Sequence, residues 1–246
     1  MLESTESVKE IQKQREKSER FEIAFNQIHT ELRKLVKLED SDHFLDLLHK
    51  AKNRHASIRN FFDDLKSYAR LRNALVHEKS RENFYIAEPH LEVVERIENI
   101  SQFLQSPPSV LSIASGRVKT YDAFEEVKDF LEDTKDDPYS QFPIYRGNKF
   151  VFLLTEGGLR SFFAEKINGH TIDLKGIKVF DLQSYEKERN VQFITPNQNV
   201  FDLEDLFEGR VQDGNKLEAV IVTPNGSKEE KPVGIITPWD LIKMDT

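Results

Sequence analysis

Residues 234–242 read Gly-Ile-Ile-Thr-Pro-Trp-Asp-Leu-Ile, a short apolar run that passes directly into a predicted helix. Thr237 fits the N-cap and Pro238 the first helical position, where a missing backbone donor costs nothing. Thr-x-x-Asp is also the spacing of a capping box, in which Thr237 and Asp240 satisfy otherwise unpaired backbone donors. The segment therefore predicts a strand that leads into a capped helix.

From residue 109 onward, short β-branched or aromatic runs alternate with helical stretches, and most of the glycines lie here. This alternation predicts strands joined by helices and turns. We expect strands at Phe142–Tyr145, Phe150–Leu154, Val191–Ile194, Leu217–Thr223 and Val233–Ile236, and a helix at Tyr121–Glu132. Strand, helix, strand pair and closing helix occur twice, which predicts two copies of one unit, at about 109–168 and about 176–246.

The segment at 234–242 resembles the signature of CBS domains, Gly-apolar-x-Thr/Ser-x-x-Asp-apolar, at every position. The resemblance covers roughly residues 109–246 and implies a tandem CBS pair of βαββα-type repeats that binds an adenine nucleotide. It implies that Asp240 hydrogen-bonds the ribose hydroxyls, and that the Thr237 hydroxyl and the helix N-terminus face phosphate. Phe142 opens an apolar strand of the type found in the family, and Ser140 falls where a small polar residue lines the adenine pocket.

The first copy departs from this signature at Thr155-Glu156-Gly157-Gly158, where a glycine replaces the aspartate. The resemblance therefore implies that the first copy's site is empty. In the second copy, Glu218 stands where phosphate-reading relatives carry a basic residue, and an acid there disfavours a highly charged ligand. AMP, ADP, ATP, an adenosine derivative and a dinucleotide all stay open as the regulatory ligand, and no catalytic cofactor is required.

The first hundred residues contain one proline and no glycine, and their apolar residues recur at helical spacing. One stripe runs from Phe21 to Leu35, and a second runs in steps of four and three from Phe44 to Ala69, which predicts one long helix. A third helix is predicted from about Pro89 to Pro107-Pro108. We expect a helical bundle over residues 1–106, and hence an α+β chain.

The second stripe ends in Arg72-Asn73-Ala74-Leu75-Val76-His77, so that a permanent cation continues the apolar register. Asp64, Tyr68 and Arg72 are spaced i, i+4 and i+8, so an intrahelical pair with the acid or the phenol is one explanation. The element also resembles the Arg-Asn-x-x-x-His motif of HEPN domains, many of which are metal-independent ribonucleases. That resemblance implies that Arg72 binds the scissile phosphate and that His77 transfers protons.

The helical geometry separates these two side chains. Five steps of about 100° place His77 about 140° around the helix from Arg72. The helix therefore breaks before His77, or two protomers contribute to one cleft, as a twofold dimer would allow. Asn73 lies four residues before His77 and could fix the tautomer of its imidazole.

The composition restricts the function further. The chain has no cysteine, which excludes thiol nucleophiles and zinc–thiolate sites, and no histidine or carboxylate cluster is spaced for a metal. No run approaches the ~18 apolar residues of a membrane span, so we expect a cytoplasmic protein with no membrane contact. The net charge is −8, from 18 Lys+Arg against 19 Asp+Glu in residues 1–105 and 17 against 24 afterwards, so any RNA contact falls to the first half.

Three functions are consistent with these observations. In the first, a nucleotide-sensing CBS pair controls a homodimeric HEPN-like endoribonuclease that acts without a metal. In the second, the protein is a nucleotide sensor without enzymatic activity, and its helical domain serves dimerisation or the binding of a partner. The third is a nucleic-acid-binding module without cleavage, which the sequence favours least.

Overall fold

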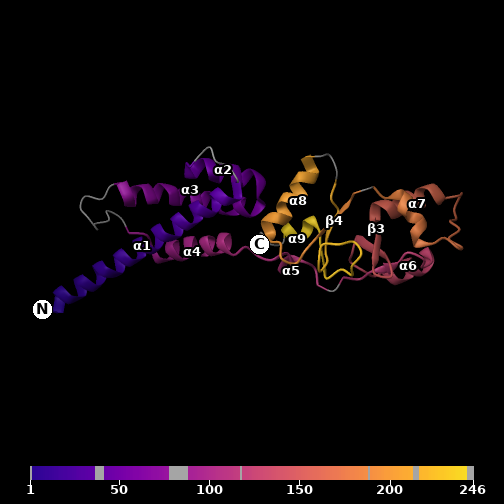
Figure 1. The fold of residues 1–246 in the computed structure, drawn as a ribbon, viewed down its shortest axis with the longest axis horizontal. Coiled ribbons are helices and arrows are strands. Elements are labelled where there is room, and N and C mark those ends of the chain that lie inside the picture. The colour runs from indigo at the N-terminus through magenta and orange to yellow at the C-terminus, as the bar shows by residue number, and fades with distance from the viewer. Residues whose placement is uncertain are drawn as a thin grey trace. The chain divides into compact units, whose positions relative to one another are not determined.

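We describe the fold from a computed structural model, which covers residues 2–36, 42–77, 88–116, 118–187, 189–212 and 216–242. The chain divides into two compact units, Met1–Pro108 and Ser109–Thr246. The first unit is helical, and the second combines small sheets with helices (Figure 1). The chain is therefore of the mixed α+β class that the sequence predicts.

The first unit contains α1 (Leu2–Val36), α2 (Phe44–Arg54), α3 (Ala56–His77) and α4 (Leu91–Gln105). Helix α1 packs against each of the other three. The side chains of Phe21, Phe25, Ile28 and Leu32 are buried, and their spacing places them on one face of α1. The predicted stripe thus forms the centre of this unit, and the predicted helix after Pro89 is also present as α4.

The single long helix predicted from Phe44 to Ala69 is wrong. The chain leaves the helical conformation at His55, which is extended (φ −123°, ψ 120°) and only 1% exposed. Helices α2 and α3 then contact each other, and both contact α1. A straight helix would carry half of the stripe away from α1, whereas the break lets both halves bury their apolar faces. The break happens to preserve the spacing, so the sequence pattern does not reveal it.

The second unit contains two three-stranded sheets of the same topology, with orders β1-β2-β3 and β4-β5-β6. In each sheet the first pair is parallel and the second antiparallel. The strands are β1 (Tyr121–Asp122), β2 (Gln141–Arg146), β3 (Lys149–Thr155), β4 (Val191–Ile194), β5 (Ala219–Val222) and β6 (Gly234–Ile236). The helices are α5 (Val110–Ile113), α6 (Val127–Thr134), α7 (Glu156–Lys166), the 3-10 helix η1 (Val179–Tyr185), α8 (Val200–Gln212) and α9 (Pro238–Ile242).

The order strand, helix, two strands, helix therefore occurs twice, as predicted. The helix predicted over Tyr121–Glu132 is wrong in its first turns, because Tyr121 and Asp122 form β1 and α6 begins only at Val127. The Asp122 carboxylate accepts a hydrogen bond from the backbone N–H of Phe124 (2.8 Å), which turns the chain after the strand. The buried Tyr121 ring faces the core instead of a helix surface.

The segment before each repeat packs on the other repeat. Ser109 and Ser115 form bridges with Asn199 and Ile235 of the second repeat, and Val110 lies in that repeat's core. The η1 segment lies between the two repeats in sequence, yet its Val179 and Leu182 belong to the core of the first repeat. A third apolar cluster joins the two sheets through residues of β2, β3 and β5, namely Tyr145, Phe150, Leu153, Ala219 and Ile221. The repeats are therefore interlocked.

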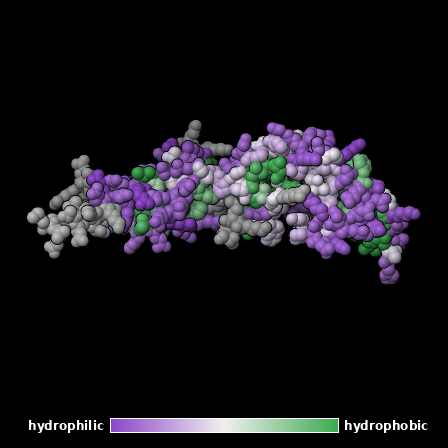
Figure 2. All heavy atoms as spheres, turned by 90° about the horizontal axis from the view of Figure 1, so that it is seen from below, coloured by the Kyte–Doolittle hydropathy of each residue, from purple (hydrophilic) through white to green (hydrophobic). Residues whose placement is uncertain are grey.

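The surface of both units is predominantly hydrophilic on the face shown in Figure 2, with separate small hydrophobic patches. In the part of the chain that the structure describes, no helix has the length and apolar character needed to cross a membrane.

Candidate functional site

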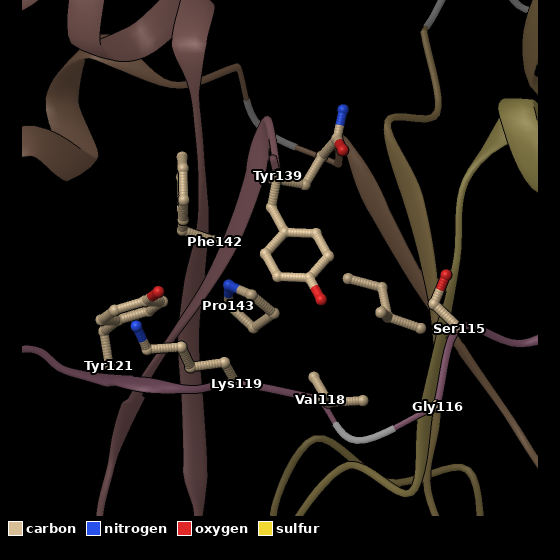
Figure 3. Close-up of a pocket in the computed structure, with 10 residues that line it drawn as sticks. Ser115, Gly116, Val118, Lys119, Tyr121, Tyr139, Phe142 and Pro143 are labelled. Carbon is tan, nitrogen blue, oxygen red and sulfur yellow. The ribbon is translucent and has the colours of Figure 1, made fainter. Parts of the chain in front are cut away.

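A cavity of about 80 Å³ lies in the second unit, between strand β2 and the segment that precedes β1 (Figure 3). Its lining consists of Ser115, Gly116, Val118, Lys119, Tyr121, Tyr139, Gln141, Phe142, Pro143 and Ile235. In Figure 3 the Tyr139 ring projects between Pro143 on one side and Ser115 on the other. Tyr139 is 52% exposed, so its ring can leave this position without opening the core.

The Asp240 carboxylate is connected to this cavity through Ser115. One carboxylate oxygen, Oδ2, accepts hydrogen bonds from the backbone N–H of Thr237 (2.8 Å) and from its hydroxyl (2.9 Å). The other oxygen, Oδ1, accepts from the Ser115 hydroxyl (3.3 Å). Asp240 is only 8% exposed, so these contacts fix its position. Asp240 thus caps the first turn of α9 through Thr237, and its other oxygen contacts Ser115 in the cavity wall.

Two other predicted residues lie in or beside the cavity. Phe142 is a lining residue, and its ring contacts those of Tyr121 and Phe130 edge-on. Ser140 lies between two lining residues, but its own hydroxyl donates to the Gln141 side chain (3.1 Å). The structure therefore brings Phe142 together with the Asp240 contact, whereas Ser140 is a neighbour of the lining.

Lys119 places a positive charge at the cavity wall. Its ammonium donates to the Asp137 carboxylate (3.0 Å) and lies 3.2 Å from that of Asp133. The Tyr121 hydroxyl also donates to Asp137 (2.9 Å). Burial and this bond raise the pKa of Tyr121 to about 12, so the phenol stays protonated at neutral pH.

No motif in the sequence pointed to Lys119, Tyr139 or Ser115. Lys119 and Ser115 come from the segment before β1, and Tyr139 comes from the turn before β2. They converge only because the segment before β1 packs on the second repeat. Glu218, predicted to disfavour a highly charged ligand, does not line the cavity, and its carboxylate pairs with Lys216 (3.0 Å).

The corresponding position in the first repeat contains a carboxylate that the motif lacks. Thr155 caps α7 by accepting a hydrogen bond from the backbone N–H of Gly158 (3.1 Å). The Glu186 carboxylate, from the segment after η1, accepts from the backbone N–H of Thr155 (2.6 Å). Burial raises the pKa of Glu186 above its ordinary value, which the bonds from Thr155 partly oppose.

A larger cavity, of about 210 Å³, lies within the helical unit. Its lining consists of Phe25, Asn26, His29, Asp42, His43, Phe44, Leu45, Ala69, Arg72 and Asn73. The rings of Phe25 and Phe44 stack, with centroids 4.4 Å apart. The predicted residues Arg72 and Asn73 therefore share a cavity with two histidines, His29 and His43, that no motif marked.

The intrahelical partner considered for Arg72 is engaged elsewhere. The Asp64 carboxylate accepts a hydrogen bond from Arg96 of α4 (3.1 Å), and Tyr68 is buried in the core. Within the described part of the chain, no hydrogen bond or ion pair of Arg72 is found, and its side chain is half-buried at the cavity wall. Arg72 is thus a cation that faces an open volume.

Helix α3 continues through His77, the third residue of the predicted catalytic set. The His77 side chain lies outside the part of the chain that the structure describes. Because the backbone is helical over the five residues from Arg72, positions 72 and 77 lie about 140° apart around the helix axis. Of the two arrangements considered from the sequence, a helix that breaks before His77 is therefore not found.

No protein-family model matches the sequence, and no curated protein is significantly similar to it. Several solved structures are similar. The CBS domain of a bacterial CNNM/CorC family Mg²⁺ transporter is 18% identical, over 63% of this chain and 84% of that one, with a TM-score of 0.43. The same domain in complex with ATP is 18% identical, over 61% and 95%, with a TM-score of 0.43.

A third similar structure is a hemolysin-like protein containing a CBS domain, from Oenococcus oeni PSU. It is 18% identical, over 57% of this chain and 92% of that one, with a TM-score of 0.41.

Proposed function

We propose that the second unit is a CBS pair that binds one adenine nucleotide, and that occupancy of this site regulates the helical unit. The observation that carries the proposal is the cavity at which Phe142 and the Ser115–Asp240 contact meet. The twofold βαββα order and the complete signature at 234–242 support the family assignment. Thr237, Asp240, Phe142 and the neighbouring Ser140 are the proposed binding residues.

The ligand must displace part of the present lining. A cavity of about 80 Å³ is smaller than the roughly 300 Å³ of a typical small-molecule site. Tyr139 is an exposed lining residue, and rotation of its ring would admit a planar base next to Phe142. The base would then contact apolar and aromatic side chains, while the ribose hydroxyls would face Asp240 and Ser115.

The charges at the cavity favour few phosphate groups. Lys119 offers one cation, and Asp137 and Asp133 already balance part of its charge. An additional phosphate must therefore compete with two carboxylates for the same ammonium. We expect AMP or ADP to bind more tightly than ATP, in line with the expectation that a highly charged ligand is disfavoured.

Calorimetric titration of the full chain with AMP, ADP and ATP tests this proposal. We expect one site per chain, because only the second repeat combines Thr237 with an aspartate. Release and identification of small molecules that copurify with the protein provides an independent test. A chain that binds none of the three nucleotides, or binds them at two equal sites, would contradict the proposal.

A second candidate function is favoured by the cavity at Arg72 and Asn73. We propose that the helical unit is HEPN-like and cleaves RNA. The 2′-oxygen of the RNA would attack the adjacent phosphorus as the bond to the 5′-oxygen breaks, giving a 2′,3′-cyclic phosphate and a 5′-hydroxyl. Arg72 would stabilise the charge that develops on the phosphate, and His77 would carry the proton between the two oxygens. If Arg72 and His77 are not catalytic, the helical unit serves dimerisation or partner binding.

The protein is expected to be a homodimer in solution. The continuous α3 helix places positions 72 and 77 about 140° apart around its axis, which supports a cleft that two protomers share. Light scattering with size-exclusion chromatography should give a mass near twice 28.7 kDa. A monomer at micromolar concentration would exclude the shared cleft, and the ribonuclease proposal would lose its geometric basis.

A further inference from the structure

The closing helices of the two repeats begin with the same pattern of hydrogen bonds, although only one of them carries an aspartate. At α9, the N–H and the hydroxyl of Thr237 both donate to Asp240 Oδ2, at 2.8 and 2.9 Å. At α7, the N–H and the hydroxyl of Thr155 both donate to Glu186 Oε1, at 2.6 and 3.0 Å. The Glu186 carboxylate therefore takes, in the first repeat, the place that the Asp240 carboxylate takes in the second.

Gly158 makes room for this carboxylate. It lies three residues after Thr155, as Asp240 lies three residues after Thr237. A Cβ atom at position 158 would overlap the Glu186 carboxylate and would lie 2.6 Å from its Cδ. Any side chain at position 158 and the present position of Glu186 therefore exclude each other. The glycine that breaks the signature is thus the partner of an acid supplied from elsewhere in the chain.

Asn190 holds Glu186 in this position. Its side-chain amide donates to Glu186 Oε2 (3.3 Å) and to the backbone carbonyl of Leu153 in β3 (3.4 Å). The backbone carbonyl of Asn190 accepts from the N–H of Glu218, just before β5 (2.7 Å). Asn190 is only 7% exposed. The carboxylate is therefore fixed by contacts from both repeats, which compensate for its removal from water.

In the second repeat the acid lies on the closing helix, and the segment that corresponds to the one carrying Glu186 has a short side chain instead. Ser115 lies six residues before β1, much as Glu186 lies five residues before β4. Ser115 has a short side chain and contacts an aspartate that belongs to the closing helix. In the first repeat the connecting segment carries the long acid, and the closing helix carries the glycine. The short serine lines the cavity and contacts Asp240 behind it, whereas the longer glutamate extends across to Thr155.

We propose that Glu186 closes the first repeat to nucleotide by occupying the acceptor position with the protein's own carboxylate, and so limits each chain to one nucleotide. This inference rests on the proposed nucleotide site of the second repeat. Glu186 then sets the number of nucleotides that each chain binds, and Gly158 is required because it leaves space for the Glu186 carboxylate.

Exchanging the two side chains tests this role. The double variant Gly158→Asp/Glu186→Ser gives the first repeat the arrangement of Asp240 and Ser115. Calorimetric titration of the full chain with AMP should give one site for the wild type and two for the exchange variant. Adding Asp240→Ala to the exchange variant should weaken AMP binding at the original site by about tenfold or more and leave the affinity of the new site unchanged. A folded exchange variant that still binds a single AMP would overturn the proposal.

Two further measurements cover the other outcomes. If the exchange variant does not unfold cooperatively on heating, Glu186→Ser alone, which adds no bulk, is titrated instead and should admit a second, weaker AMP. If the wild type binds no AMP and the exchange variant binds one, the proposed site in the second repeat fails while the role of Glu186 stands. If neither binds AMP, both proposals fail.

The placement of Glu186 is tested without any ligand. Gly158→Ala should lower Tm in the wild-type background, because the added Cβ overlaps Glu186, and should lower it much less in the Glu186→Ser background. Gly209→Ala is the matched control, since an added Cβ there meets no atom within 4 Å. Equal losses of Tm in the two backgrounds would show that Glu186 does not occupy the space next to Gly158 and would overturn the proposal.

Discussion

Replacing Asp240 with alanine is expected to weaken AMP binding roughly 10- to 150-fold, or about 1.5 to 3 kcal/mol, the range for a hydrogen bond to a charged group. The carboxylate is buried and already oriented by Thr237, so it needs no reorganisation before it accepts from the ribose hydroxyls. The effect should appear in the affinity of adenosine as well as AMP, because the proposed contact is to the sugar. Titration of both ligands into the full chain measures it.

The same substitution removes the hydrogen bonds from Thr237, so its effect on folding must be separated from its effect on binding. Asp240→Asn keeps the shape and one acceptor, and its Tm should fall less than that of the alanine variant. Asp129→Ala, at an exposed position of α6, should leave the affinity unchanged. If Asp240→Ala is folded and binds AMP as tightly as the wild type, the nucleotide site lies elsewhere.

Cleavage of single-stranded RNA in the presence of EDTA is the other large expected effect. His77→Ala should slow cleavage by about a hundredfold or more if the imidazole carries the proton. Arg72→Lys should also lose activity, because an ammonium does not reproduce the bidentate contact of a guanidinium with phosphate. The products, resolved by gel and mass spectrometry, should end in a 2′,3′-cyclic phosphate.

Two substitutions on the helical unit serve as matched controls. Arg70→Lys changes an exposed arginine of the same helix, and His90→Ala changes an exposed histidine whose side chain does not cap α4. Both should retain the wild-type rate. Assays with and without AMP test regulation, since a nucleotide can change the rate only if it binds the active and inactive states with different affinity. Equal background cleavage by the wild type and His77→Ala would leave only the non-enzymatic sensor.

The sequence pattern predicted the elements whose periodicity is local. Val191–Ile194 is a strand with the predicted bounds, and the other four predicted strands are present with ends shifted by at most two residues. The pattern failed where long-range packing decides the conformation. The break at His55 preserves the spacing of a single helix, and Tyr121–Asp122 is a strand because it pairs with Ile144 and Tyr145 of β2. Neither the packing of α2 and α3 on α1 nor the pairing of β1 with β2 can be recognised from the spacing of nearby residues.

The candidate sites were predictable only in part, for the same reason. Phe142 and Asp240 lie in motifs that can be found in the sequence, and the structure connects them through Ser115. Ser115, Lys119 and Glu186 come from connecting segments, where no periodicity marks a side chain as buried or as facing a cavity. The exchange of roles between Gly158 and Glu186 depends on two residues 28 positions apart in the sequence, which meet only in the folded chain.

The segment 109–115, with which the second unit begins, is held on the second repeat by the bridge between Ser115 and Ile235. The chain leaves the helical unit at Pro108, and within seven residues it reaches the hydroxyl that bonds to Asp240. The segment 109–115 therefore contributes Ser115 to the wall of the proposed nucleotide site. A ligand that rearranges this wall would move Ser115, and with it the segment that leads back to Pro108. Nucleotide binding would then reach the helical unit through the covalent chain and would need no contact surface between the two units.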